Sequence, residues 1–260
     1  MFNKRAGVSE VVMDPRNRVA LVTGGGTGLG RAICRKLAAA GCKVAVGYLS
    51  SRENADETVA EIEAGRGRAM AVHADVSSSD DVQEMVDSVT AGLGSIDILV
   101  NNAATRVIVP FNDLDALKEE DWDRIIAVNL RGPYLCAKAV APTMKQRGAG
   151  KIINVTSIGG IRPGGSSLAY SVSKSGEEML GRCLAVALAP EIQVNNIAPG
   201  LMDTPAGRSL GEEWWQNYID GALLKRMPVV DDVATAALYF VRNDSVTAQT
   251  AAIDGGVLTY

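Results

Sequence analysis

The phenol of Tyr170 and the ammonium of Lys174, four residues apart, are the pair in this sequence best suited to proton transfer. On a helix this spacing places both groups on one face, one turn apart. A phenol ordinarily titrates at about pH 10 and exchanges protons poorly near neutrality, but an adjacent ammonium favours the charged phenolate. Such a pair could protonate a reacting oxygen or accept a proton from a hydroxyl. The same spacing also arises by chance on amphipathic helices.

Two further polar residues could assist this pair. Ser157 follows the apolar run 151–156, so its hydroxyl would lie at the carboxyl end of a strand, where open α/β folds bind ligands. Asn129 lies inside a long helical stretch, where a polar amide is otherwise hard to justify, although it could simply form local hydrogen bonds. Neither residue indicates a function by itself.

A glycine-rich loop near the start of the chain predicts a site for a phosphate-bearing cofactor. Gly24, Gly28 and Gly30 lie between the apolar run 18–23 and a helical run that begins at Leu29. Without a Cβ the chain can turn sharply, approach a pyrophosphate, and open a helix whose N–H groups face that anion. The loop could also be only a flexible turn, but its place between a strand and a helix favours dinucleotide binding.

Strands and helices alternate along the whole chain. The predicted strands are continuous apolar runs with little alternation between apolar and polar residues, as expected when helices cover both faces of a parallel sheet. We therefore expect an α/β fold, a doubly wound parallel sheet of about seven strands in a single domain. The predicted strands are 18–23, 43–48, 69–73, 96–100, 151–156, 193–197 and 251–253, and the predicted helices are 29–40, 52–64, 79–91, 119–146, 169–188 and 231–241.

Composition excludes several classes of protein. The formal net charge of −4 offers no basic field for nucleic acid, and no stretch of 18 apolar residues could span a membrane. The single histidine, His73, makes metal sites with two histidines impossible, and it is expected to end a strand. The four cysteines match no metal or redox spacing and are expected to be buried free thiols, which suits a cytoplasmic protein.

Two segments depart from the alternation. Residues 1–16 are polar and poorly patterned, so we expect a mobile N-terminal tail before a catalytic domain at 17–260. Residues 201–227 form an insertion that contains Trp214, Trp215 and Tyr218 in helix-compatible sequence. An insertion of this kind commonly covers a ligand, although its aromatic residues could equally anchor helices to the core or to a neighbouring subunit.

Several motifs together resemble the short-chain dehydrogenase/reductase family, and the subgroup that includes 3-oxoacyl-carrier-protein reductases. The resemblance covers nearly the whole chain, from Arg18 to Gly256. The motifs are Thr23 to Gly30, Asp75-Val76, Asn101-Asn102-Ala103-Ala104, Asn129, Ser157, Tyr170 with Lys174, and Pro199-Gly200. Ala104 replaces a more usual glycine.

The resemblance implies roles for these residues. Asn129, Ser157, Tyr170 and Lys174 would be catalytic, with Ser157 holding the substrate oxygen and Asn129 bending its helix and anchoring a water linked to Lys174. Asp75 would contact adenine, although it could also cap a strand end. The resemblance also implies a homotetramer, with a dimer second. The residues expected at the cofactor are Gly24, Thr27, Gly28, Leu29, Gly30, Ser50, Ser51, Arg52, Asp75, Val76, Asn102, Ala103, Tyr170, Lys174, Pro199, Gly200, Met202 and Thr204.

The end of the second predicted strand bears on the choice between NADP(H) and NAD(H). A carboxylate there would bond a ribose 2′-hydroxyl and repel a 2′-phosphate. The sequence instead has Ser50, Ser51 and Arg52, which offer donors and a cation, so we expect NADP(H). Ser51 could merely cap the next helix while Arg52 stays solvated. Thr27 also stands where many relatives that prefer NADP(H) carry a basic residue, so NAD(H) is the alternative.

These observations predict a metal-free oxidoreductase that transfers a hydride between NADP(H) and a small-molecule carbonyl or secondary alcohol, with Tyr170 as general acid and base. One alternative is a 3-oxoacyl-carrier-protein reductase, although the basic patch that would bind an acidic carrier is not evident. A non-catalytic regulator that senses the cofactor is another, but it would not need Tyr170, Lys174 and Ser157 together. No nucleic acid or membrane partner is expected.

Overall fold

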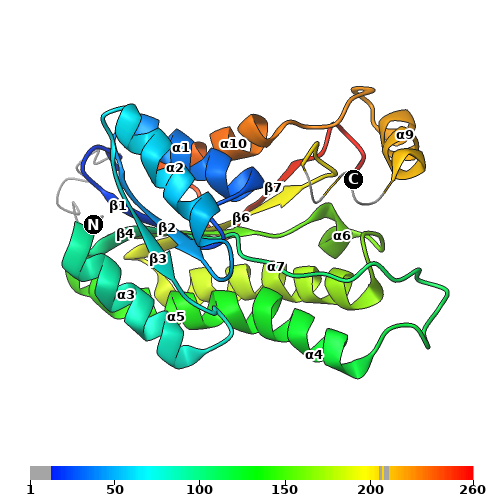
Figure 1. The fold of residues 1–260 in the computed structure, drawn as a ribbon, viewed down its shortest axis with the longest axis horizontal. Helices are drawn as coiled ribbons and strands as arrows, with labels where there is room; N and C mark the ends of the chain where they lie inside the picture. The colour runs from blue at the N-terminus through cyan, green and yellow to red at the C-terminus, as the bar shows by residue number, and fades with distance from the viewer. Residues whose placement is uncertain (1–12, 205–206, 208–210, 260) are drawn as a thin grey trace, which may run out of the picture.

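The computed structural model describes residues 13–204, 207 and 211–259, and its strands form one parallel sheet of seven (Figure 1). The order across the sheet is β3-β2-β1-β4-β5-β6-β7, which confirms the predicted doubly wound fold. The chain order reverses between β1 and β4, and this switch point opens a crevice at the carboxyl ends of the strands. The strands are β1 (Val19–Val22), β2 (Lys43–Tyr48), β3 (Arg68–His73), β4 (Ile96–Asn101), β5 (Gly150–Val155), β6 (Ile192–Pro199) and β7 (Thr250–Ile253).

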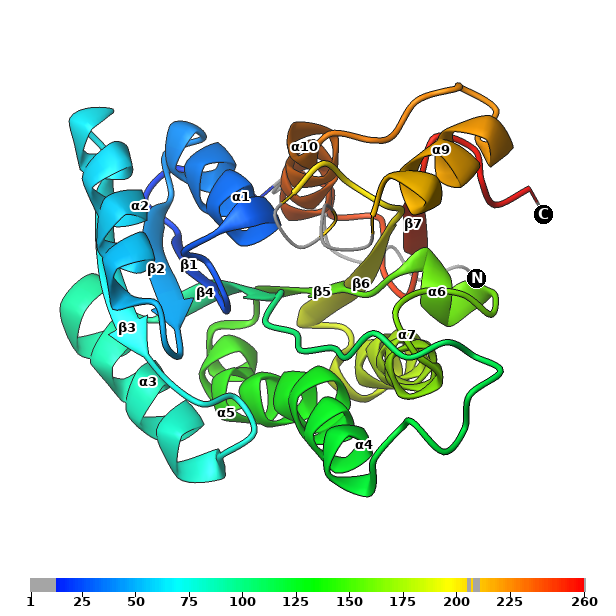
Figure 2. The same cartoon turned by 45° about the vertical axis from the view of Figure 1, so that its right-hand side comes forward.

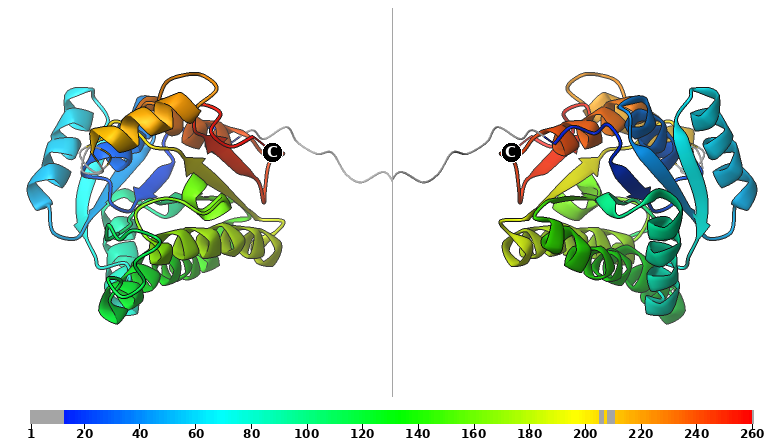
Figure 3. Two further views of the ribbon diagram at one scale, coloured as in Figure 1. Left: turned by 90° about the vertical axis from the view of Figure 1, so that its right-hand side faces the viewer. Right: turned by 90° about the vertical axis from the view of Figure 1, so that its left-hand side faces the viewer.

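Helices cover both faces of the sheet, as Figures 2 and 3 show. One layer holds α1 (Gly28–Ala39), α2 (Arg52–Ala64) and α10 (Val230–Arg242). The opposite layer holds α3 (Ser79–Leu93), α4 (Glu119–Ile126), α5 (Gly132–Arg147) and α7 (Leu168–Leu188). Two short helices, α6 (Ile158–Ile161) and α9 (Glu212–Gly221), lie at the carboxyl edge of the sheet.

Successive side chains of a strand enter different cores because they point to opposite faces of the sheet. In β1, Leu21 packs in the core beneath α3, α5 and α7, whereas Ala20 and Val22 pack in the core beneath α1 and α10. The central strands β1, β4 and β5 are therefore buried along their whole length, which explains why they read as continuous apolar runs.

The long helix predicted at 119–146 is interrupted. Between α4 and α5 the chain forms a π-helical turn, η1 (Ala127–Arg131), which holds one more residue per turn than an α-helix. The side chain of Asn129 does not cap a helix end. Its amide forms hydrogen bonds with the backbone of Thr105, which lies in the loop after β4. The sequence pattern alone does not contain this long-range contact.

Three smaller expectations have mixed outcomes. His73 ends β3 and packs edge-on against Tyr48. Cys34, Cys42 and Cys136 are buried free thiols, but Cys183 on α7 is exposed, so the prediction of a buried side chain is wrong there. Much of the predicted N-terminal tail, residues 1–12, lies outside the described residues, while the buried Met13 donates its N–H to Asp244.

In the part of the chain that the structure describes, no helix is long and apolar enough to cross a membrane.

Candidate active site

A cavity of about 1080 Å³ opens at the carboxyl ends of the strands, beside the switch point between β1 and β4. Loops that follow β1 to β6 form its walls, and α9 closes one side. Nearly all of the predicted site residues reach this one cavity. Those that line it are Gly24, Thr27, Gly28, Leu29, Gly30, Ser50, Ser51, Asp75, Val76, Asn102, Ala103, Ser157, Tyr170, Lys174, Pro199, Gly200, Met202 and Thr204, whereas Arg52 and Asn129 do not.

The glycine loop has a backbone that only glycine adopts easily. Gly24 and Gly28 have φ angles of +64° and +51°. A Cβ on Gly30 would collide with the carbonyl oxygen of Gly24, so the loop can lie close against α1 only without that side chain. These requirements agree with the spacing found in the sequence.

The N-terminus of α1 presents unpaired donors to the cavity. The first N–H groups of a helix have no partner within it, and the N-cap residue Thr27 provides no side-chain hydrogen bond to them. The first turn of α1 contains no acidic residue that could repel an anion. A pyrophosphate suits this uncapped helix end, so the residues present fit a dinucleotide cofactor.

The far end of the cavity, at the end of β2, is lined by hydroxyl and amide side chains. Ser50, Ser51 and Asn54 lie on the wall there, together with Tyr48. Arg52 is three-quarters exposed and pairs with Asp56 one helical turn along α2, at 3.4 Å. The guanidinium of Arg52, which was expected beside a 2′-phosphate, thus lies along the surface of α2. Asn54 lines the wall and was not among the predicted cofactor residues.

Asp75 follows β3, where its side chain caps the turn after the strand and lines the cavity. Its Oδ1 accepts hydrogen bonds from the backbone and hydroxyl of Ser77, at 2.9 and 2.6 Å, and its Oδ2 accepts one from Arg124 at 3.1 Å. Partial burial opposes ionisation, but these hydrogen bonds and the Arg124 charge hold the pKa of Asp75 below its usual range. Asp75 is therefore an ionised end cap on the cavity wall.

Tyr170 and Ser157 reach the cavity from two neighbouring elements. Tyr170 stands in the first turn of α7, which begins at Ser167 because the Ser167 hydroxyl accepts the backbone N–H of Tyr170 at 3.3 Å. Ser157 lies two residues after the end of β5 and caps α6, accepting the backbone N–H of Gly159 at 3.1 Å. The helix start and the strand end thus bring both hydroxyl groups to one cavity.

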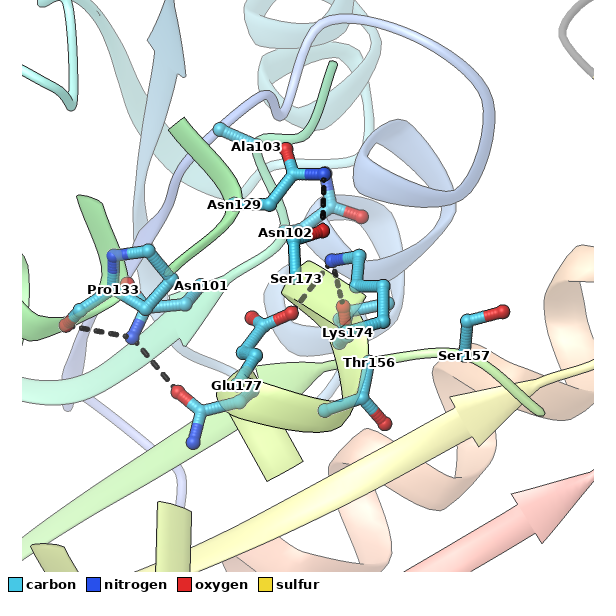
Figure 4. Close-up of polar contacts among 12 residues, drawn as sticks. Asn101, Asn102, Ala103, Asn129, Pro133, Thr156, Ser157, Ser173, Lys174 and Glu177 are labelled. Carbon is cyan, nitrogen blue, oxygen red and sulfur yellow. Dashed lines mark hydrogen bonds and ion pairs between the residues drawn. The ribbon is translucent and has the colours of Figure 1, made fainter. Parts of the chain in front are cut away.

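Lys174 is buried and its ammonium has fixed partners (Figure 4). Its Nζ donates to the carbonyl oxygen of Val155 at 2.8 Å and to Oε2 of Glu177 at 2.6 Å. Burial by itself would lower the pKa of Lys174, but the charges of Glu177 and Tyr170, together with the hydrogen bond to Glu177, raise it. Burial also raises the pKa of Glu177 to about 7, although the Lys174 charge acts in the opposite direction. Glu177 was not among the residues predicted at the site.

Asn129 lies behind the cavity wall. Its amide exchanges two hydrogen bonds with the backbone of Thr105, at 2.8 and 2.9 Å, and donates to the Ser173 hydroxyl at 3.1 Å (Figure 4). Thr105 lines the cavity, and Ser173 precedes Lys174 on α7. Asn129 therefore ties the loop after β4 to the helix that carries the tyrosine and the lysine.

The turn after β6 and helix α9 close one side of the cavity. A Cβ on Gly200 would collide with the hydroxyl of Tyr218, and that hydroxyl donates to the carbonyl oxygen of Asp254 at 2.5 Å. Burial raises the pKa of Tyr218, so it remains a neutral donor. Trp214 lines the cavity with about half of its surface exposed. Trp214, Tyr218 and the turn after β6 thus form one side of the cavity.

Comparison with known proteins places the chain in a family. The model of the short chain dehydrogenase family matches residues 18–214, so the chain belongs to this family of oxidoreductases. It is 35% identical to the 3-oxoacyl-[acyl-carrier-protein] reductase FabG of Staphylococcus epidermidis, over 93% of this chain and 99% of that protein. It is 36% identical to 3beta-hydroxysteroid dehydrogenase 1 of Eggerthella lenta, over 95% of this chain and 96% of that one.

A solved structure of a relative has the same fold. The gluconate 5-dehydrogenase of Burkholderia cenocepacia, in complex with NADP and tartrate, superposes with a TM-score of 0.87 at 31% identity. The match covers 95% of this chain and 98% of that one. The resemblance to this family, inferred from the motifs, is confirmed.

Proposed function

We propose that the protein transfers a hydride between NADP(H) and a carbonyl or secondary alcohol, with Tyr170 as general acid and base. The observation that carries this proposal is the meeting of Ser157, Tyr170 and Lys174 in the cavity that also holds the glycine loop. When bound, the nicotinamide supplies or takes up the hydride. The chain itself has to orient the substrate oxygen and move its proton.

Each of the three residues has a separate task in the proposal. Ser157 donates a hydrogen bond to the substrate oxygen and holds it against the phenol of Tyr170. Tyr170 gives its proton to that oxygen during reduction and accepts one from the hydroxyl during oxidation. Lys174 is fixed by Val155 and Glu177, and its charge favours the phenolate. Asn129 keeps the loop at Thr105 and helix α7 in register.

Replacement of Tyr170 by phenylalanine tests the proposal directly. It removes the proton donor and leaves the ring, so we expect kcat to fall by about 10²–10⁴-fold with cofactor binding retained. Tyr239→Phe is a matched control, because Tyr239 lies on α10 with about half of its surface exposed. Equal rates for Tyr170→Phe and the control would reject the proposal. Cofactor-dependent thermal stabilisation without any turnover by the wild type would favour the cofactor-sensing regulator instead.

NADP(H) is proposed over NAD(H) because the wall at the end of β2 has no carboxylate. Ser50, Ser51 and Asn54 can donate to a 2′-phosphate, and the one acidic residue among the described lining residues is Asp75, after β3. The gluconate 5-dehydrogenase structure with NADP supports the same choice. We expect Ser51→Asp to weaken NADPH binding by about tenfold or more while sparing NADH, because the new carboxylate repels the phosphate. Titration of both cofactors, with Ser51→Asn as the uncharged control, measures this; equal losses for both would contradict it.

A 3-oxoacyl thioester is the second candidate substrate. Several curated relatives that match over more than nine-tenths of this chain are named 3-oxoacyl-[acyl-carrier-protein] reductases. A panel of a 3-oxoacyl thioester, 3-ketosteroids, sugar acids and simple ketones would separate the candidates by kcat/KM. Preference for the thioester by a hundredfold or more would replace the general proposal with this one.

A homotetramer is proposed for the assembly. The outer faces of α5 and α7 expose apolar side chains that a partner subunit could cover. Light scattering on the purified protein measures the mass, with 27.3 kDa per chain. The exposed apolar residues are Tyr134, Val172, Met179 and Val186.

A further inference from the structure

Glu177 is a buried carboxyl group beside the proposed proton-transfer pair. It lies on α7, three residues after Lys174, and only 1% of its side chain is exposed. A carboxylate is almost never buried to this extent unless it is paired. Its described partner is the Lys174 ammonium at 2.6 Å (Figure 4). Structural reasons alone would favour an apolar side chain at such a position.

The geometry of Lys174 leaves part of its ammonium free for the cavity. An ammonium has three N–H donors, and two of them bond Val155 and Glu177. Lys174 also lines the cavity, so the remaining donor is available to a ligand there. Glu177 therefore fixes the direction of the ammonium and also stabilises its charged form.

Other charges around the pair are few. Among the described residues, the charges of Glu177 and Tyr170 shift the pKa of Lys174. The charge of Lys174 shifts the pKa of Glu177. Strand β6 and helix α6 carry no titratable side chain. The titratable residues on α7 itself and on the elements that pack against it include Glu178 on α7, Arg131 in η1, Arg124 on α4, Lys138 on α5 and Lys151 on β5. Glu178 pairs with Arg182, Arg124 with Asp75, and Lys151 with Asp244.

We propose that Glu177 is a positioning residue that sets how much of the Lys174 charge acts on Tyr170, so that proton transfer depends on a second ionisation. With Glu177 ionised, the pair is neutral as a whole and favours the phenolate weakly. With Glu177 protonated, the ammonium acts with its full charge. This inference rests on the proposed function, because it assigns Tyr170 the proton transfer.

The sign of the effect follows from electrostatics. Removal of the Glu177 charge makes the potential at Tyr170 more positive, so the phenolate forms at lower pH. We expect Glu177→Gln to move the acid limb of kcat/KM for alcohol oxidation down by about one pH unit, which is about tenfold in rate below the limb. Glu177→Asp retains the charge and should keep the limb within a few tenths of a unit of the wild type.

Glu178→Gln is the matched control. Glu178 is the next residue on the same helix, is also buried, and pairs with Arg182 instead of Lys174. Its replacement should leave the limb unmoved. A limb of Glu177→Gln that stays with the wild type, or that moves to higher pH, overturns the proposal. A purely structural role for Glu177 would lower the melting temperature without moving the limb, and thermal unfolding of each variant identifies that outcome.

A spectroscopic titration tests the proposal without turnover. The phenolate absorbs in the near ultraviolet, and subtraction of the Tyr170→Phe spectrum isolates Tyr170 from the other five tyrosines. In the Glu177→Gln background the isolated phenolate signal should appear about one pH unit lower. An unchanged midpoint rejects the role of Glu177. If the wild type turns over no substrate but the midpoint still moves, the proposed function fails and the electrostatic inference stands.

Discussion

Asn102, directly after β4, is hydrogen-bonded to Thr23, directly after β1, by both its backbone and its side chain. Its N–H donates to the Thr23 hydroxyl at 3.0 Å, and its Nδ2 donates to the Thr23 carbonyl oxygen at 2.9 Å. Nδ2 also reaches the carbonyl oxygen of Gly24 at 3.0 Å. These bonds join the two strands at the switch point and hold the first turn of the glycine loop.

Asn102→Ala should therefore affect stability and cofactor binding together. It leaves two loop carbonyl oxygens without their donor, at a cost of about 1–3 kcal/mol in the free energy of unfolding. We expect the dissociation constant of NADPH to rise by about tenfold, since the loop loses its support. Urea unfolding and fluorescence titration measure the two effects. Asn112→Ala, at an exposed asparagine in the loop before α4, is the control, and equal behaviour of the two variants would contradict this role.

Gly30→Ala should abolish cofactor binding without unfolding the chain. The added methyl group collides with the Gly24 carbonyl oxygen, and a Cβ there would also approach the Asn102 side chain to 2.7 Å. The loop must move away from α1, which displaces the donors that face the pyrophosphate. We expect NADPH affinity to fall by at least a hundredfold. Gly221→Ala has open space around it and should bind like the wild type; cofactor binding retained by Gly30→Ala would show that the loop tolerates the displacement.

Tyr218→Phe should loosen the cover over the cavity. The hydroxyl of Tyr218 is the donor that ties α9 to Asp254, and its loss removes about 1 kcal/mol. If α9 positions the substrate, KM should rise several-fold while kcat changes little. Steady-state kinetics measure the two constants, and Tyr239→Phe serves again as the comparison. A fall in kcat with unchanged KM would instead place Tyr218 in the chemical step.

Glu177 should also make the stability of the fold depend on pH. Burial raises the pKa of its carboxyl from 4.5 to about 7, so the folded state retains a proton that the unfolded state has lost between these values. The stability of the wild type therefore decreases, relative to Glu177→Gln, as the pH rises from 4.5 to 7, by about 3 kcal/mol in all. Urea unfolding of both proteins at pH 5 and pH 8 measures the change. A difference between them that does not vary with pH would contradict the buried, protonated state of Glu177.

The fold was predictable because its signals are local. Apolar runs such as 43–48 coincide with strands, and α10 follows the spacing of Val233, Ala237 and Phe240 along one face. The glycine loop was equally predictable from the sequence. Gly24 and Gly28 have positive φ angles, and Gly30 lies too close to the Gly24 carbonyl oxygen for a Cβ. The interruption at η1 was not predictable from periodicity, because Asn129 bonds Thr105, twenty-four residues away.

The positions of the site residues were predictable where a motif lies within two residues of the end of a strand, as with Asp75 and Ser157. Arg52 shows what the sequence does not contain: its position is right for a phosphate, but its guanidinium pairs with Asp56 one turn along the helix and does not line the cavity. Glu177 was missed for a related reason. A charged residue at that spacing reads as part of a solvated helix face, and only the packing of α7 on β5 and β6 shows that it is buried.

The π-helical turn at Ala127–Arg131 inserts one extra residue between α4 and α5, which would otherwise form one continuous α-helix. Excision of a single residue would let this stretch close as an ordinary α-helical turn, which changes the directions of the side chains within the turn and leaves the flanking helices nearly in phase. Asn129 would then lose its hydrogen bonds to the loop at Thr105. The extra residue thus acts on the wall of the cavity through one side chain, while the path of the helices before and after it hardly depends on it.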